Sequence, residues 1–161
     1  MLISTSVAAF TRPNDTTAYA SGDLVANSTT AGSVVPLAFP IWRTGQGQTI
    51  IQRMRIAKSS TTTSAAAFRL HLYEQTPIPT NGDNGVWASD KAASYLGNID
   101  IAAFFAFTDG AAAFGSAPAG SELRLRLSSG TTLYGLMEAR AGYTPAANEI
   151  FTVTLECLDG Y

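Results

Sequence analysis

The feature that most constrains the fold of this chain is an alternation of apolar and polar residues with a period of two. It is clearest over residues 122–127, where leucines alternate with a glutamate and arginines. The same alternation recurs over residues 50–56, 68–73 and 151–157. Because successive side chains of a β-strand point to opposite faces, each segment is predicted to be a strand with one buried and one outward face.

Weaker strand signals lie at residues 2–9, 34–39, 96–107 and 131–139, which brings the total to about eight. This pattern is typical of an antiparallel sandwich or barrel. We expect an all-β fold, a jelly-roll-like antiparallel β-sandwich. Pro, Gly, Asn, Asp or Ala gather in the predicted loops, at residues 12–15, 44–47, 77–85 and 108–121.

One short helix of about two turns is also expected. Ser89 suits its N-cap, Asp90 its first turn, and Gly97 a left-handed C-terminal end.

The length of 161 residues fits one domain, residues 1–161. Few large apolar residues follow Phe10 within the first 20 residues, so residues 1–20 are predicted to form an extended arm that orders only against a neighbouring molecule. Deleting residues 1–20 is then expected to abolish partner binding and leave the sandwich folded. The first residues carry no basic region before their short apolar run, so synthesis in the cytoplasm is expected.

The chain is poor in charge. Charged residues make up 14% of it, against about 25% in an ordinary domain. The net charge of -2 argues against a direct nucleic-acid partner, because such binders usually carry a basic excess. No apolar run is long enough to span a membrane, so no membrane partner is expected. A neutral exterior rich in small residues must face water or another protein.

Residues that catalyse reactions are scarce. The only histidine, His71, falls on the outward phase of its strand and is predicted to be an exposed or interface imidazole. The only cysteine, Cys157, falls on the inward phase and is predicted to be a core residue. Residues 81–85 resemble half of a calcium loop, but no glutamate follows at the required spacing, so a turn is predicted. We therefore expect no enzyme activity and no catalytic, cofactor or metal site.

Most basic residues are arginines, and those in predicted strands lie on the outward phase. One interpretation is that they pair with Glu122, Glu138 or Glu156 across neighbouring strands. The other is a protein interface, where arginine is enriched and lysine is depleted. The candidate partner-interface residues are Arg12, Arg53, Arg55, Arg69, Arg124 and Arg126.

Aromatic residues are expected to pack mainly in the core. They are Trp42, Trp87, Tyr95, Phe104, Phe105 and Phe107. A sugar-binding platform at Trp42 or Trp87 is the alternative.

Two stretches resemble a family of small virion proteins from tailed bacteriophages. The first runs from Phe10-Thr11-Arg12-Pro13-Asn14-Asp15 through Tyr19 to residues 22–27. The second contains Arg69-Leu70-His71-Leu72-Tyr73, then residues 83–90, and ends at Tyr95-Leu96-Gly97. Some members of this family resemble capsid decoration (cement) proteins with β-sandwich folds, and the family has no catalytic motif.

The resemblance implies a structural protein on the outer surface of the capsid, with the major capsid protein as its partner. A homotrimer would suit the threefold positions of an icosahedral shell. The alternative is a tail or fibre-associated receptor-binding module, which would bind glycans through the loops at residues 77–88 or 108–121.

Overall fold

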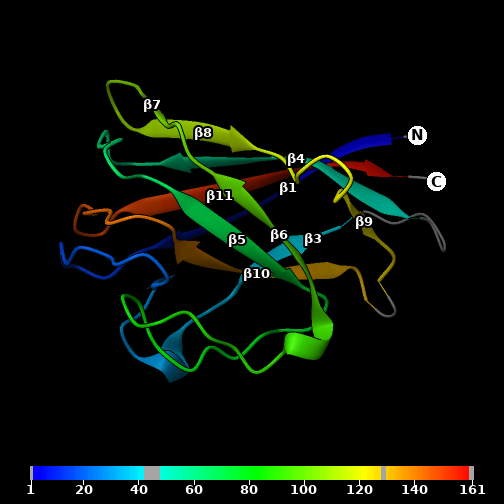
Figure 1. Cartoon of the computed structure of the whole chain (residues 1–161), viewed down its shortest axis with the longest axis horizontal. Coiled ribbons are helices and arrows are strands. Elements are labelled where there is room, and N and C mark those ends of the chain that lie inside the picture. Colours follow the sequence, from blue (N-terminus) through cyan, green and yellow to red (C-terminus); the bar gives the residue numbers. More distant parts are fainter. Residues whose placement is uncertain (1, 42–47, 128–129, 160–161) are drawn as a thin grey trace.

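The computed structural model describes residues 2–41, 48–127 and 130–159, which form two antiparallel sheets packed face to face (Figure 1). The first sheet contains β1 (Leu2–Thr11), β4 (Thr49–Lys58), β7 (Phe105–Ala106), β8 (Ala111–Gly115), β9 (Leu123–Leu125) and β11 (Ile150–Asp159). The second sheet contains β2 (Leu24–Val25), β3 (Leu37–Pro40), β5 (Phe68–Tyr73), β6 (Tyr95–Ile101) and β10 (Thr132–Ala139).

The eight longest strands of the described ranges have the connectivity of a jelly roll. They run in the order β1-β11-β4-β8 in the first sheet, and β3-β10-β5-β6 in the second. Numbered along the chain, these orders are 1-8-3-6 and 2-7-4-5, the interleaving produced by two Greek keys. The predicted all-β, jelly-roll-like sandwich is therefore confirmed.

The core lies between the sheets, where the inward side chains of the alternating segments meet. Phe68 of β5 is at its centre and packs edge-to-face on Tyr143 and Phe151, with ring centroids 5.3 and 5.4 Å apart. Cys157 is 1% exposed, which confirms its predicted place in the core. Burial raises the pKa of its thiol to about 12, so the group stays protonated at neutral pH.

The predicted helix after Ser89 is wrong. The chain makes only a 3₁₀ turn, η2 (Ala92–Ser94), and β6 starts at the next residue. Ser89 donates a hydrogen bond to the Tyr73 hydroxyl instead of capping a helix, and Gly97 takes a φ of +144° within β6. Pairing with β5 therefore overrides the local helix signals. The other helical turn is η1 (Ala31–Ser33), and no helix of the described residues has the length and apolar composition to cross a membrane.

The segment 108–121 is also more regular than its composition predicts, because β8 lies inside it. Its alanines and glycine carry no strong strand signal, but small residues are needed where the two sheets approach each other. A Cβ atom on Gly115 would lie 2.3 Å from the backbone oxygen of Asp100 in β6. Close contact between β6 and β8 thus explains a strand that propensity alone does not reveal.

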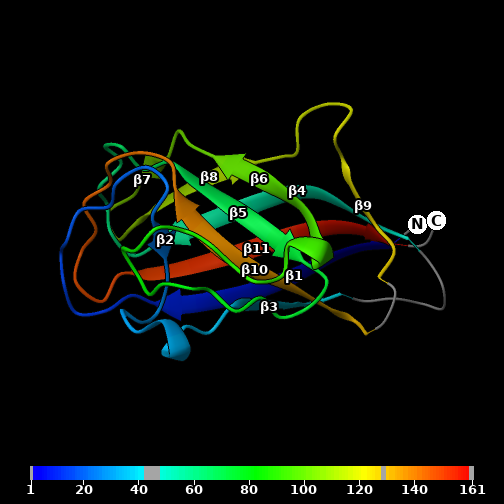
Figure 2. The same ribbon diagram turned by 60° about the horizontal axis from the view of Figure 1, so that its bottom comes forward.

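The predicted N-terminal arm is wrong as well. Residues 2–11 form β1, which pairs with β11 from Leu2 opposite Asp159 to Thr11 opposite Ile150. Figure 2 shows the two strands side by side along their length. Arg12 and Tyr19, which follow β1, are each 2% exposed. The start of the chain is therefore part of the folded body, because a full ladder of backbone hydrogen bonds holds it to the first sheet.

Candidate functional site

The structure distributes the candidate arginines over different parts of the molecule and does not join them in one surface. Arg53, Arg55 and Arg124 lie on the outer face of the first sheet, and Arg69 lies on the outer face of the second. Arg126 is exposed just after β9. Arg12 is buried, so its assignment to a partner interface is wrong.

Arg12 has a buried partner far along the chain. Its Nη2 donates to the Asp83 Oδ2 at 2.6 Å, and its Nε donates to the Tyr19 hydroxyl. The Oδ1 of Asp83 accepts from the Tyr19 hydroxyl at 2.7 Å and from the backbone N–H of Ala26 at 2.8 Å. Residues 81–85, predicted to be a turn, therefore supply the carboxylate that neutralises Arg12.

The outer face of the first sheet carries exposed apolar side chains from four of its strands. We call this surface the open face, and its large apolar residues, between 46% and 71% exposed, are Ile3, Val7, Phe105, Phe114 and Ile150. The expectation that the aromatic residues pack mainly in the core is not met by Phe105 or by Phe107, which is 60% exposed. Phe104 is buried as predicted.

Two charged side chains of the open face pair with each other. Arg53 donates to Glu156 with both Nε and Nη2, at 2.9 and 2.8 Å, which confirms the predicted cross-strand pairing for this arginine. The Arg53 guanidinium also lies over the Phe114 ring, 4.5 Å from its centroid. These side chains line a shallow pocket of about 480 Å³. Arg55 donates to the Thr154 hydroxyl at 3.3 Å.

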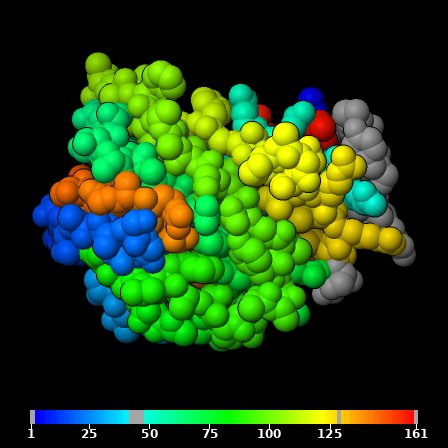
Figure 3. All heavy atoms as spheres, in the orientation of Figure 1, coloured from blue at the N-terminus to red at the C-terminus, as the bar shows by residue number. Residues whose placement is uncertain are grey.

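The second sheet differs, because a segment folds over its outer face. Residues 74–94, here called the covering segment, run below β5 and β10 in Figure 1, and their green surface spreads over the lower part of Figure 3. Trp87 of this segment stacks on His71, with ring centroids 3.7 Å apart and planes 12° from parallel. His71 is therefore buried, and the prediction of an exposed or interface imidazole is wrong.

Hydrogen bonds fix both nitrogens of His71. Its Nε2 lies 2.7 Å from the Glu138 carboxylate, and its Nδ1 lies 3.1 Å from the Tyr95 hydroxyl. Burial lowers the pKa of His71, so the ring is neutral at pH 7. A neutral ring must then donate from Nε2 to Glu138 and accept at Nδ1 from Tyr95. The Tyr95 oxygen also accepts from the Asn98 amide at 2.8 Å.

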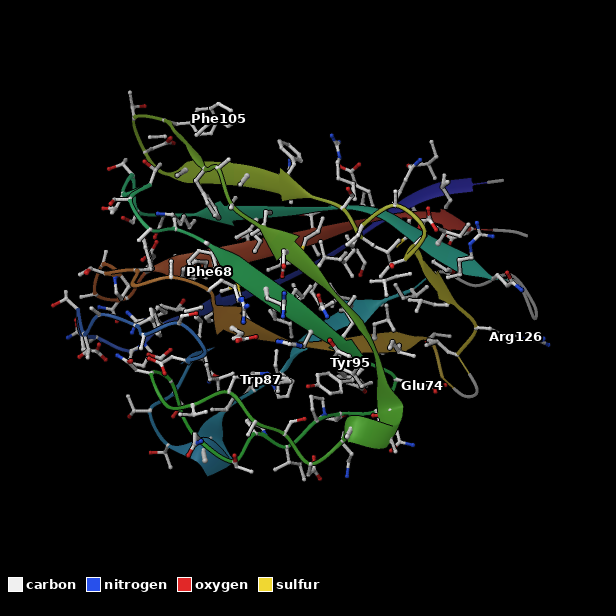
Figure 4. The ribbon with its side chains drawn as sticks, in the orientation of Figure 1. Phe68, Glu74, Trp87, Tyr95, Phe105 and Arg126 are labelled. Atoms are coloured by element: carbon white, nitrogen blue, oxygen red, sulfur yellow. The ribbon has the colours of Figure 1, made fainter. Side chains whose placement is uncertain are left out.

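A second pocket, of about 400 Å³, lies beside this cluster. Its lining residues are all uncharged, namely Tyr73, Trp87, Ala88, Ser89, Ala92 and Tyr95. Core packing was expected for most aromatic residues, but Trp87 is only partly buried here and Tyr95 is 37% exposed. Figure 4 shows both far from Phe105, on the opposite side of the molecule. Trp42, the other candidate platform, lies outside the described residues.

The remaining predicted pairs differ from expectation. Arg69 pairs with Asp100 through Nε and Nη2, at 2.5 and 2.7 Å, whereas Glu138 binds His71 and Arg140. Glu122 accepts from the backbone N–H of Gly120.

The cluster around His71, beneath the covering segment, was not predicted, although the sequence contains a signal for it. The outward positions of β5 hold an arginine, a histidine and a tyrosine, and such large residues are typical of a face that another segment covers.

His71 gives a pH-dependent stability. Its pKa is lowered in the folded protein by burial, and Glu138 opposes only part of that effect. The unfolded chain binds a proton near pH 6.5 that the folded chain does not, so stability is complete above this pH and is lost as the pH falls towards the folded pKa. Asp100, which also faces this region, has a pKa lowered by its hydrogen bonds from Arg69 and does not titrate in this window.

The measurement is urea unfolding of the parent and of His71→Gln, each at about pH 7.5 and at about pH 5. The parent midpoint is expected to fall more at the lower pH than that of the variant. Equal pH dependence in both proteins would show that His71 does not cause the change.

Comparisons with known proteins add little. No model of a protein family matches the chain, and no curated protein matches its sequence. Among solved structures, the chain is similar to a chain in the cryo-EM structure of the virus-like particle of the extra small virus of the giant freshwater prawn Macrobrachium rosenbergii. The TM-score is 0.26. The sequence identity is 10%, over 97% of this chain and 77% of that chain.

Proposed function

We propose that this protein is a structural component of a bacteriophage virion, and that it binds a neighbouring virion subunit through the open face. The observation that carries the proposal is the exposure of large apolar side chains on the outer face of the first sheet. The resemblance of residues 10–27 and 69–97 to small phage virion proteins supports the same context.

The open face has the chemistry of a protein-binding surface. Its aromatic and aliphatic side chains project from paired strands, so no backbone segment has to become ordered when they bind. Exposed apolar patches with polar surroundings mark protein contacts in soluble proteins. Arg53 and Glu156 already satisfy each other, so covering this pair does not leave either of the two charges buried alone.

In detail, we propose a decoration (cement) protein on the outer surface of the capsid. The open face would bind the major capsid protein, and three copies would associate at a threefold position of the shell. Each contact would be weak, but three copies bound together would hold the site with an affinity well above that of one contact. Bridging neighbouring capsid subunits in this way would strengthen the shell against the pressure of packaged DNA.

The test compares two aspartate variants on phage particles. Phe114→Asp places a charge among the apolar side chains of the open face and is expected to lower the amount of protein bound per particle at least about tenfold. Val86→Asp is the matched control, because Val86 is 67% exposed but lies on the covering segment of the other sheet. Quantitative mass spectrometry of purified particles measures occupancy, and electron cryomicroscopy locates the density.

Density on the capsid that disappears with Phe114→Asp and remains with Val86→Asp supports the proposal. Density confined to the tail, or equal occupancy for both variants, contradicts it.

A further inference from the structure

We propose that the pocket between the covering segment and β6 binds a neutral carbohydrate. The site lies on the second sheet, away from the open face, so it goes beyond the proposed capsid contact. A volume of about 400 Å³ falls within the range of small-ligand sites in proteins.

The walls of this pocket are aromatic rings that the protein holds in fixed positions. Trp87 is stacked on His71, and the rings of Tyr73 and Tyr95 meet edge-to-face with centroids 5.4 Å apart. The face of an aromatic ring carries partial negative charge, whereas the C–H groups on the face of a pyranose carry partial positive charge. Rings fixed before binding cost little entropy when a ligand stacks against them.

Hydroxyl groups at the pocket have hydrogen-bonding capacity left for a ligand. The Tyr95 oxygen donates to His71 and accepts from Asn98, which leaves one lone pair. The Ser89 oxygen donates to the Tyr73 hydroxyl at 3.2 Å and retains both lone pairs. A sugar combines apolar faces with hydroxyl donors at its edges, so it matches this arrangement of rings and oxygens.

The indole of Trp87 adds an unsatisfied donor. Its Nε1 is buried and has no acceptor among the residues that the structure describes. Buried indole N–H groups normally have a partner. This N–H is therefore a donor without an acceptor, among the described residues, on a side chain that lines the pocket.

The absence of charge on the lining residues selects among ligands. None of the side chains that line the pocket is ionisable near neutral pH. Burying a sialic acid carboxylate or a phosphate here would remove it from water without a cation in the wall to pair with it. The proposal is therefore a neutral hexose or N-acetylhexosamine unit of a longer glycan.

The test is a glycan array with the full chain, followed by isothermal titration with the best neutral oligosaccharide. Ala92→Leu fills part of the pocket, and Ala93→Leu is the matched control, because Ala93 is an exposed neighbour that does not line it. Ala92→Leu is expected to weaken binding at least about tenfold, and Ala93→Leu to leave it unchanged. A urea midpoint equal to that of the parent shows that each variant is folded.

Tyr95→Phe gives an independent check, because it keeps the ring and removes the hydroxyl. It is expected to weaken binding about tenfold. Binding of only acidic glycans, equal binding by Ala92→Leu and Ala93→Leu, or no saturable binding on the array would overturn the proposal. Phe114→Asp should bind the glycan like the parent, and Ala92→Leu should occupy particles like the parent, so the two proposals fail separately.

Discussion

Asp83→Ala is expected to lower the free energy of unfolding by about 3–5 kcal/mol, because it leaves the guanidinium of Arg12 buried without its counter-charge. The side chains of Arg12 and Asp83 are both 0% exposed, and the Asp83 carboxylate also accepts from the Tyr19 hydroxyl and the Ala26 backbone. One truncation therefore leaves three donors without their acceptor. Urea unfolding monitored by circular dichroism measures the loss.

Asp15→Ala is the matched control for this prediction. Asp15 is the other carboxylate that contacts Arg12, at 3.4 Å, but its side chain is 34% exposed. Ion pairs open to water contribute about 0–1 kcal/mol, so this variant is expected to lose no more than about 1 kcal/mol. Similar losses for both variants would contradict the conclusion that burial makes the Asp83 pair critical.

Deletion of residues 1–20 is expected to abolish cooperative folding. The deletion removes β1, so the backbone groups of β11 that face it lose their partners. It also removes Phe10, which stacks on Phe151 with centroids 5.5 Å apart, and it takes both Arg12 and Tyr19 from Asp83. Thermal unfolding of the fragment 21–161 is the measurement, and the parent transition is expected to be lost.

A synthetic peptide of residues 1–20 provides the control. If the fragment fails only because β1 is missing, adding the peptide should restore the transition by strand addition. A fragment that melts like the parent without the peptide would revive the idea of a detachable arm.

The alternation of the sequence predicted the sandwich because strand faces are set locally. Phe68 and Leu70 lie on the same face of their strand whatever its neighbours are. The core-facing side chains of residues 68–73 could therefore be predicted from that segment alone. β8 was not predicted, because its alanines and glycine carry no strong strand signal and the close approach of Gly115 to Asp100 in β6 depends on tertiary packing. The helix predicted after Ser89 was wrong for a similar reason, because pairing of β6 with β5 sets the backbone conformation from Tyr95 onward.

The surroundings of His71 could not be predicted from its strand. Its outward position was assigned correctly from the alternation, but exposure depends on whether another segment returns to cover that face. Trp87, 16 positions after His71 in the sequence, returns to this face and stacks on His71, which leaves the imidazole buried and neutral. Arg12 and Asp83, 71 positions apart, show the same limit, because a carboxylate in a turn gives no sign of a distant guanidinium.

The strand orders have a consequence for how the chain is made. β11 lies between β1 and β4, and β10 joins β3 to β5, so the two described strands that come latest in the sequence occupy the middle of both sheets. Until they emerge, the earlier strands have no partner on one side and their apolar faces stay open to other nascent chains. Neither sheet can be completed before β10 and β11 have been made, so the fold cannot grow strand by strand in chain order.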